Sequence, residues 1–264
     1  MVEGFHRIYR CAILSFKARF IWLKPEFYIG IKFILPFFQM MFFGMVAYFT
    51  QGTVAMKYSI IGNSVHSIAV NCVMGVAMVI GLERTFGMLP TLLTTPANRI
   101  LIFNSQILLQ IMDGLFSCLI CMFYAWMIFD INFSDLSWFS FFSTLVLTSI
   151  SLSSIGVLVG SVGIISNNVV PIMNIIYLLL LMLCGVNIPL SDLPTFIRII
   201  ADFIPLTYGI DAVRAIINGK HFSSLLKSHI VPMLTLTFFY YFFGILLIKM
   251  FEYKSKVSGT FDRF

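Results

Sequence analysis

Leu82-Glu83-Arg84-Thr85-Phe86-Gly87-Met88-Leu89-Pro90-Thr91-Leu92-Leu93-Thr94-Thr95-Pro96-Ala97-Asn98-Arg99 is the stretch of sequence that decides the fold. It is a short charged and turn-forming interruption between two apolar runs. Residues 68–81 contain no charged residue, and residues 100–129 contain only Asp113. A hydrocarbon core about 30 Å thick takes about 20 apolar residues to cross as a helix. The two flanking runs therefore predict membrane spans, and the quoted stretch predicts the loop between them.

The loop has the features of a short helix that lies at the membrane surface. Glu83 and Thr85 suit the start of such a helix, and Pro96 would end it because the proline ring cannot continue the hydrogen-bond ladder. We expect this helix to face a partner in water. An ordinary polar connector is the alternative interpretation.

The composition is that of an all-α polytopic membrane protein. Of the 264 residues, 59% are hydrophobic and only 11% are charged, whereas soluble domains have about 45–50% apolar and about 25% charged residues. The mean hydropathy is +0.98. The net charge of +6 does not indicate nucleic-acid binding, because the basic residues flank the apolar runs and are better explained by orientation in the membrane.

Six spans are predicted within a single transmembrane domain, at residues 28–49, 58–81, 100–129, 138–165, 169–186 and 230–250. Residues 1–27 predict a basic amphipathic helix in the membrane interface, and residues 251–264 predict a tail. Lys32, near the start of the first span, is expected to extend toward the lipid head groups. The small-residue pair Gly156 and Gly160 predicts close helix packing.

The stretch at residues 187–219 breaks the pattern between the fifth and sixth spans. Three prolines divide it into pieces too short to cross a bilayer: Pro189, Pro194 and Pro205. Residues 193–203 and 208–218 each predict a short helix. Asp211 and Arg214 are three positions apart, so they can pair on one helix face.

The distribution of basic residues predicts the orientation. Six spans place both termini and the loop at residues 82–99 on the same side of the membrane. That side carries the basic N-terminal helix, Arg84, Arg99 and the basic tail, so the positive-inside rule makes it the cytoplasmic side. We expect the chain to lie in a plasma membrane of the bacterial inner-membrane type.

Asp113 is the one carboxylate that the sequence places inside a span. His66 lies at a similar depth and is a candidate partner for it; Asn71 and Gln110 are others. A charge near the middle of a bilayer costs several kcal/mol unless it is paired or wetted. Asp113, His66 and Asn71 are therefore candidates for a translocation path, with a structural hydrogen bond between helices as the alternative.

No catalytic, cofactor-binding or metal-binding set is predicted. The sequence has no phosphate-binding loop of the P-loop type, and its histidines do not have metal-ligand spacing. Energy for transport must then come from ion coupling or from a partner. Ion-coupled carriers usually hold several intramembrane charges, so the single aspartate favours a partner.

The chain resembles the permease subunits of type 2 ATP-binding-cassette exporters. The loop Glu83-Arg84-x-x-Gly87-x-Leu89, followed by Leu92-Leu93-Thr94-Thr95-Pro96, is similar to a family motif. So is Gly185-x-x-Ile188-Pro189-Leu190-x-x-Leu193-Pro194, followed by Ile204-Pro205-Leu206-Thr207-Tyr208-Gly209-Ile210-Asp211-Ala212-Val213-Arg214. The second wording is closer to drug, antibiotic and nodulation-type exporters than to polysaccharide exporters.

The resemblance implies roles for both unusual stretches. The loop would be a coupling helix that docks on an ATPase subunit through these residues: Glu83, Arg84, Thr85, Phe86, Gly87, Leu89, Leu92, Thr95 and Pro96. The second stretch would form re-entrant helices at the outer face, with these residues in them: Pro189, Pro194, Pro205, Thr207, Tyr208, Asp211 and Arg214.

The implied partners are two ATP-binding-cassette ATPases, which bind the ATP and Mg²⁺, a second permease that is identical or a sister chain, and membrane lipid. No nucleic acid and no cofactor in this chain are expected. The implied cargo is a drug, antibiotic, peptide or lipid-like amphipathic molecule, with a polysaccharide or lipid-linked glycan as the alternative. Hypotheses of another class are an ion-coupled carrier or channel and a non-transport membrane assembly factor.

Overall fold

The computed structural model describes residues 24–85, 99–133, 136–163, 169–220 and 222–258, and for residues 25, 81–85, 99–103, 163 and 251–258 it describes the backbone only. The described residues form helices and no strand. The long helices are α2 (Pro25–Gln51), α3 (Thr53–Ala69), α6 (Arg99–Phe129), α7 (Trp138–Gly163) and α12 (Val231–Ser258). A π-helical turn, η1 (Val70–Gly75), joins α3 to α4 (Val76–Thr85).

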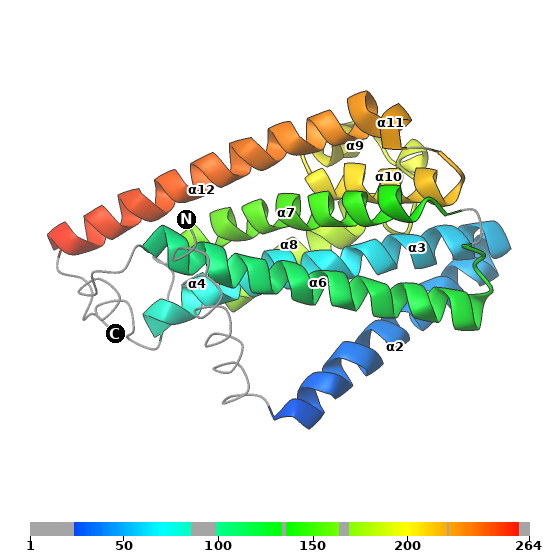
Figure 1. The fold of residues 1–264 in the computed structure, drawn as a ribbon, viewed down its shortest axis with the longest axis horizontal. Helices are drawn as coiled ribbons and strands as arrows, with labels where there is room; N and C mark the ends of the chain where they lie inside the picture. Colours follow the sequence, from blue (N-terminus) through cyan, green and yellow to red (C-terminus); the bar gives the residue numbers. More distant parts are fainter. Residues whose placement is uncertain (1–23, 86–98, 134–135, 164–168, 221, 259–264) are drawn as a thin grey trace.

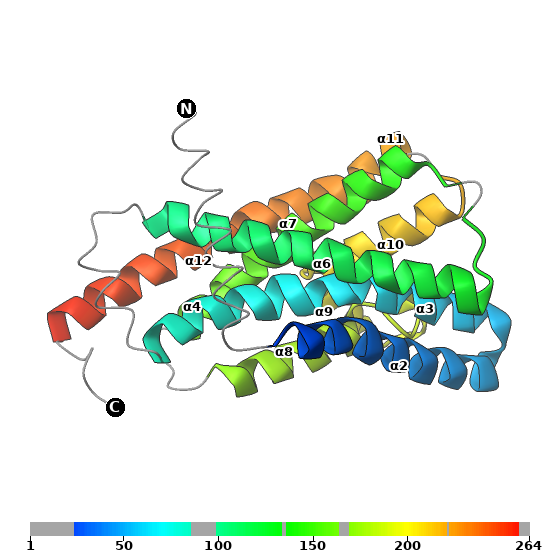
Figure 2. The ribbon, with the colours of Figure 1, turned by 60° about the horizontal axis from the view of Figure 1, so that its bottom comes forward.

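The shorter helices follow α7 in the chain. They are α8 (Val170–Leu183), η2 (Leu190–Asp192), α9 (Thr195–Asp202), α10 (Pro205–Ile217), α11 (Phe222–Leu225) and η3 (Leu226–Ile230). Figure 1 shows α9, α10 and α11 gathered toward one end of the bundle. The end of α4, the start of α6 and the end of α12 lie toward the other end, and the rotated view in Figure 2 shows the same arrangement.

Five helical segments are long and apolar enough to cross a membrane: Glu26–Gln51, Thr53–Ile80, Asn104–Phe129, Trp138–Val162 and Phe222–Met250. They correspond to five of the six predicted spans. The helix in the place of the remaining span is α8, which has only 14 described residues. At 1.5 Å per residue it is about 21 Å long, which falls short of the hydrocarbon thickness, so six spans are not confirmed.

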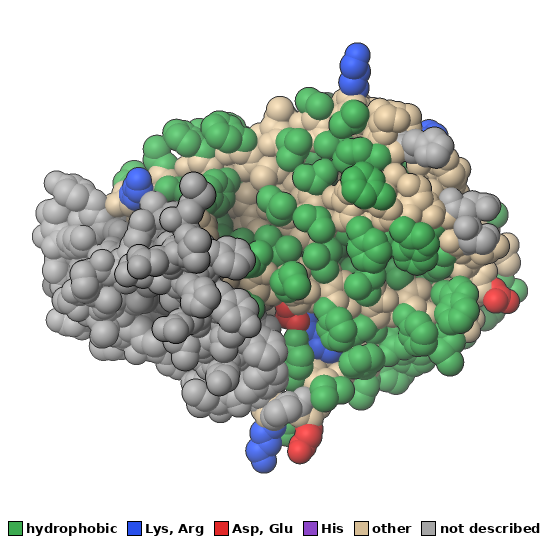
Figure 3. Space-filling view, in the orientation of Figure 1, with side chains coloured by type: hydrophobic (Ala, Val, Ile, Leu, Met, Phe, Trp, Pro, Cys, Tyr) green, Lys and Arg blue, Asp and Glu red, His purple; other side chains and the backbone are tan. Residues whose placement is uncertain are grey.

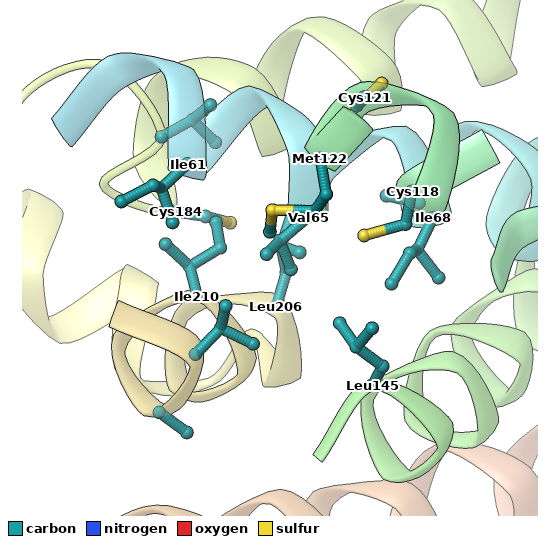
Figure 4. Close-up of a cluster of buried hydrophobic side chains, with 14 of the residues drawn as sticks. Ile61, Val65, Ile68, Cys118, Cys121, Met122, Leu145, Cys184, Leu206 and Ile210 are labelled. Atoms are coloured by element: carbon teal, nitrogen blue, oxygen red, sulfur yellow. The ribbon is translucent and has the colours of Figure 1, made fainter. Parts of the chain in front are cut away.

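The core of the bundle is built around α3. All eleven residues from Ser59 to Ala69 are buried. Figure 4 shows its Ile61, Val65 and Ile68 beside side chains of three other helices, namely Cys118 and Met122 of α6, Leu145 of α7, and Leu206 and Ile210 of α10. Because Leu206 and Ile210 are fully buried, the short helix α10 is part of the core and not a surface loop.

Close packing of α7 on η1 and α4 depends on the two glycines predicted to lie at a helix contact. A Cβ added at Gly156 would lie 2.5 Å from the backbone oxygen of Cys72, and one added at Gly160 would lie 2.8 Å from Ile80 Cδ1. Cβ atoms do not approach a backbone oxygen this closely without displacing it, so the packing prediction for this pair is confirmed.

Gly156→Val is therefore expected to destabilise the fold by about 1–3 kcal/mol, the usual range for overpacking a tight contact. The measurement is the thermal midpoint of the purified protein in detergent. Gly30→Val is the matched control, because its added Cβ would meet only Ile34 Cδ1 at 3.9 Å. Equal midpoints for the two variants would show that the α7 contact tolerates a larger residue.

Candidate functional site

Five polar side chains meet inside the bundle where α2, η1 and α6 come together; we call them the inner polar cluster. Its members are Tyr28, Lys32, Asn71, Asp113 and Ser117. The Lys32 ammonium lies 2.9 Å from Asp113 Oδ2 and donates to Asn71 Oδ1 at 2.5 Å and to Ser117 Oγ at 2.8 Å. The Tyr28 hydroxyl donates to the other carboxylate oxygen of Asp113.

The cluster lies well inside the apolar segments. Asp113 is nine residues inside the span that begins at Asn104, and Asn71 is nine residues inside the span that ends at Ile80. At 1.5 Å per residue, both lie about 14 Å from the span ends nearer to Thr85 and Arg99. The side chains of Lys32 and Asp113 are only 9% and 11% exposed, so the two charges neutralise each other at hydrocarbon depth.

This geometry corrects two sequence predictions. Lys32 does not extend toward the head groups, because its ammonium is held inside the bundle by Asp113. His66 does not pair with Asp113 either. Its ring lies against Tyr177, with ring centroids 5.1 Å apart, and its two nitrogens have no hydrogen-bond partner among the described residues. Gln110, the other candidate, packs against Gly75.

A second polar group, the outer polar cluster, lies toward the other end of α3. It consists of Gln39, Ser59, Asn63, Tyr177 and Asn187. Asn63 Nδ2 donates to Asn187 Oδ1 at 2.7 Å, and Gln39 Nε2 donates to Asn63 Oδ1 at 3.1 Å. The Ser59 hydroxyl donates to Asn187 Oδ1, and the Tyr177 hydroxyl donates to Gln39 Oε1.

The two clusters lie on one stripe of α3 and its continuation. Ser59, Asn63, Ser67 and Asn71 are spaced four residues apart, which places them on one helix face. Two members bond to side chains of α2, Asn63 to Gln39 and Asn71 to Lys32. Polar side chains therefore follow much of the α2–α3 contact, with His66 and Tyr177 next to the stripe.

The stretch at residues 187–219 divides into short helices at its prolines, as the sequence predicts. Pro189 and Pro194 immediately precede η2 and α9, and Pro205 is the first residue of α10. α10 begins three residues earlier than expected, so Thr207 lies in its first turn. The Thr207 hydroxyl donates to the Ala201 oxygen, and the Tyr208 hydroxyl donates to the Asp202 oxygen. Both bonds tie α10 to α9.

Arg214 fastens α10 to the rest of the bundle. Its guanidinium donates to the backbone oxygens of Gly185, Val186 and Tyr58, each at 2.9 Å. The guanidinium carbon lies 3.3 Å from the centroid of the Tyr58 ring, a cation–π contact. The predicted pair with Asp211 is present at 3.6 Å. Burial lowers the pKa of Arg214 to about 10, so it remains charged near neutral pH.

The chain turns sharply at Gly185 to reach this arginine. Gly185 has a φ of +69°, a left-handed conformation that glycine adopts without a steric penalty. The turn follows the end of α8 and presents two successive carbonyl oxygens to Arg214. Gly62 of α3 leaves the room for it, because an added Cβ there would lie 2.5 Å from Arg214 Nη2.

The chain matches a known protein family. Residues 11–218 match the ABC-2 type transporter family, a match that includes the loop at residues 82–99, both polar clusters and Arg214. The chain belongs to the ABC-2 type transporter family. It is therefore a membrane permease component of an ABC transporter, a class that normally lacks an ATPase site of its own and works with an ABC ATPase. No curated protein matches the chain as a close relative.

In this ABC-2 permease the described structure reaches only the edge of the expected ATPase-docking loop. Glu83, Arg84 and Thr85 form the last turn of α4, so they continue a membrane helix and do not begin a new one. The other docking residues fall in the range 86–98, outside the described residues, and their predicted roles stay predictions: Phe86, Gly87, Leu89, Leu92, Thr95 and Pro96.

Proposed function

We propose that this permease exports a drug, antibiotic, peptide or lipid-like amphipathic molecule with energy from a partner ABC ATPase. The observation that carries the proposal is the pair of polar clusters along the α2–α3 contact. Polar and charged side chains at hydrocarbon depth are expensive, and in membrane proteins they mark pathways for polar groups. The exposed surface of α2 is largely apolar, so the permease offers polar and apolar surface side by side.

In this proposal, the conformational change of the ATPase is transmitted to the permease through the loop at residues 82–99. Thr85 and Arg99 frame this loop at one end of the bundle, the end toward which α12 also runs (Figure 1). That arrangement supports a cytoplasmic side that holds the coupling loop and the tail of a bacterial inner-membrane protein. Two permeases, identical or sister chains, would stand above two ATPases that bind ATP and Mg²⁺, and both termini would be cytoplasmic.

The outer end of the proposed path would be closed by α9 and α10. Arg214 and Thr207 hold these helices together and against α3, which supports the re-entrant role. In a transport cycle the coupling loop would move the cytoplasmic ends of α4 and α6, and the resulting shift would reach the inner polar cluster, which includes residues of η1 and α6.

A second candidate is an ion-coupled carrier, because the Lys32–Asp113 pair is the kind of intramembrane charge that such carriers use. A polysaccharide or lipid-linked glycan cargo is the alternative within the ABC class. Reconstitution in proteoliposomes separates the mechanisms. ATP hydrolysis by the partner drives flux in the first, whereas an ion gradient alone drives it in the second.

Gly87→Pro and Glu83→Arg are expected to abolish the stimulation of the partner ATPase by the permease, because each would disrupt the docking loop, by backbone geometry or by charge. ATP hydrolysis of the reconstituted complex is the measurement. Lys57→Ala is the control, since Lys57 is an exposed cation at the opposite end of the bundle. Normal stimulation by both loop variants, with normal membrane insertion, would remove the loop from the mechanism.

A further inference from the structure

The imidazole of His66 is buried without a hydrogen bond to any described residue. It lies 13 residues from Thr53 and 14 residues from Ile80, the two ends of its apolar segment, which places it near the middle of the span. The side chain is fully buried. A neutral imidazole has one donor nitrogen and one acceptor nitrogen, so two hydrogen bonds are missing.

The neighbouring polar side chains of α3 are satisfied. Ser64 and Ser67 donate to backbone oxygens of their own helix, and Asn63 bonds to other members of the outer polar cluster. A buried polar group without a partner is costly, because it has lost its hydrogen bonds to water. Inside a bilayer no bulk water replaces them. The stability of the closed bundle therefore does not explain a histidine at this position.

Tyr177 of α8 covers the imidazole. The two ring centroids are 5.1 Å apart and the rings are tilted by 55°. The imidazole also lies against the α8 backbone at Tyr177, but the carbonyl there belongs to the helix ladder and no hydrogen bond of normal geometry forms. The Tyr177 hydroxyl donates to Gln39 Oε1 at 3.3 Å, which is long for a hydroxyl donor. A weak bond to α2 therefore holds the cover in place.

α8 is a helix that can shift at low cost, because only three of its 14 residues are buried: Met173, Leu180 and Leu181. Figure 2 shows it running beside α2. Its Ile175 and Leu178 are 59% and 54% exposed, and Figure 3 shows the surface along α2, at the lower right, as largely apolar. The unsatisfied imidazole thus lies behind a movable cover with apolar surface on both sides.

We infer that the junction of α2, α3 and α8 at His66 is a binding site for an amphipathic molecule with an uncharged head group, and that Tyr177 is the cover of this site. The head group carries hydroxyl or primary amide groups, which both donate and accept hydrogen bonds. In the bound form the Tyr177 ring moves aside, and the head group bonds to both nitrogens of His66 and to Gln39. The apolar chain lies along the exposed faces of α2 and α8.

The charge class of the ligand follows from the side chains at the site. Gln39 and Tyr177 are neutral, and burial at the middle of the span favours the neutral imidazole of His66. Arg214, which lies beside Gly62, is already engaged by three backbone oxygens. A charged head group would enter hydrocarbon depth without a counter-charge from these side chains, which is expensive. The use of the site in export rests on the proposed function, whereas binding to the site does not.

The test uses the permease alone, in phosphatidylcholine nanodiscs without ATPase or nucleotide. The probe is decyl glucoside with a diazirine in its alkyl chain, and the yield of photocrosslinking measures its binding. We expect it to label peptides from α3 and α8. Unlabelled decyl glucoside should displace it at concentrations at least about tenfold lower than decyl sulfate or decyltrimethylammonium. Equal displacement by the three compounds, or labelling of other segments only, would overturn the inference.

Variants of His66 test the role of the ring nitrogens. His66→Phe and His66→Leu should each weaken probe binding at least about tenfold. At least one of them should keep or exceed the wild-type thermal midpoint without probe, because it removes an unsatisfied buried group. His229→Phe is the matched control, since His229 Nδ1 already lies 2.6 Å from Ser228 Oγ, and it should leave probe binding unchanged.

Two results with these variants would contradict the site. Wild-type binding by both His66 variants would show that the ring nitrogens do not hold the head group. Lower thermal midpoints in both would show that the imidazole has partners in the empty protein. A loss of binding in His229→Phe equal to that in the His66 variants would count against the site as well.

A last arm separates exported cargo from a resident membrane lipid. In proteoliposomes that contain the complete complex, ATP-dependent removal of the glucoside probe from the site would identify cargo, and retention in the presence of ATP would identify a site for a resident lipid. Both results require the site. A permease that binds the probe in nanodiscs but shows no ATP-dependent flux in the complex would count against the proposed export and not against the binding.

Discussion

Asp113→Leu is expected to destabilise the permease by about 3–5 kcal/mol, the range for breaking one side of a buried ion pair. The change removes the carboxylate that lies 2.9 Å from the Lys32 ammonium inside the bundle, and it removes an acceptor of the Tyr28 hydroxyl. Because the Lys32 side chain is only 9% exposed, water does not replace the lost partner. The thermal midpoint of the purified protein should fall accordingly.

The companion variants separate charge from packing. Lys32→Met alone should destabilise to a similar extent, because it removes the ammonium that pairs with the Asp113 carboxylate. The combination of both changes should recover much of the loss, since neither charge of the pair then remains inside the bundle. Additive losses in the double variant would show that the two side chains act independently and that the pair is not the source of the stability.

Arg214→Met is expected to destabilise the end of the bundle that holds α9 and α10 by about 2–5 kcal/mol, because buried acceptors that lose their donor cost about 1–3 kcal/mol each. Three backbone oxygens depend on this guanidinium, at Gly185, Val186 and Tyr58. Limited proteolysis of the purified protein should cut the stretch at residues 187–219 faster in the variant than in the wild type.

Arg198→Met is the control for this change. Arg198 is exposed and donates only to the nearby backbone oxygens of Leu193 and Ser191 among its described hydrogen bonds, so its loss should stay below about 1 kcal/mol. Arg214→Lys should resemble Arg214→Met, because an ammonium lacks the planar fork that reaches three carbonyl oxygens and stacks on Tyr58. Full stability of Arg214→Lys would show that charge alone is sufficient.

The sequence predicted the elements whose signal is local. Runs of about 20 apolar residues identify spans without any knowledge of their neighbours, and prolines mark the starts of η2, α9 and α10 wherever these helices pack. The Asp211–Arg214 pair could be predicted because both residues lie on one turn of one helix. The hydrogen bonds by which Arg214 attaches α10 to the bundle could not be predicted from the sequence. Their acceptors lie about 30 and 150 positions away in the chain.

The partner of Asp113 could not be found from depth alone. Lys32 was placed by its distance from the start of its span, and a lysine near a span end usually extends to the head groups. A signal was present nevertheless, because Tyr28, Lys32 and Gln39 are spaced four and seven residues apart on one face of an otherwise apolar helix. The π-helical turn at η1 has no such local signature.

The most direct test of the account asks which side of the membrane holds the loop at residues 82–99. Thr95→Cys is labelled with a membrane-impermeant maleimide, in intact cells and in inverted membrane vesicles, with Cys11 replaced by serine. The account predicts labelling only in inverted vesicles, and protection of the cysteine when the partner ATPase is bound. Labelling in intact cells would contradict it, because an ATPase in the cytoplasm could not reach a loop on the outer face.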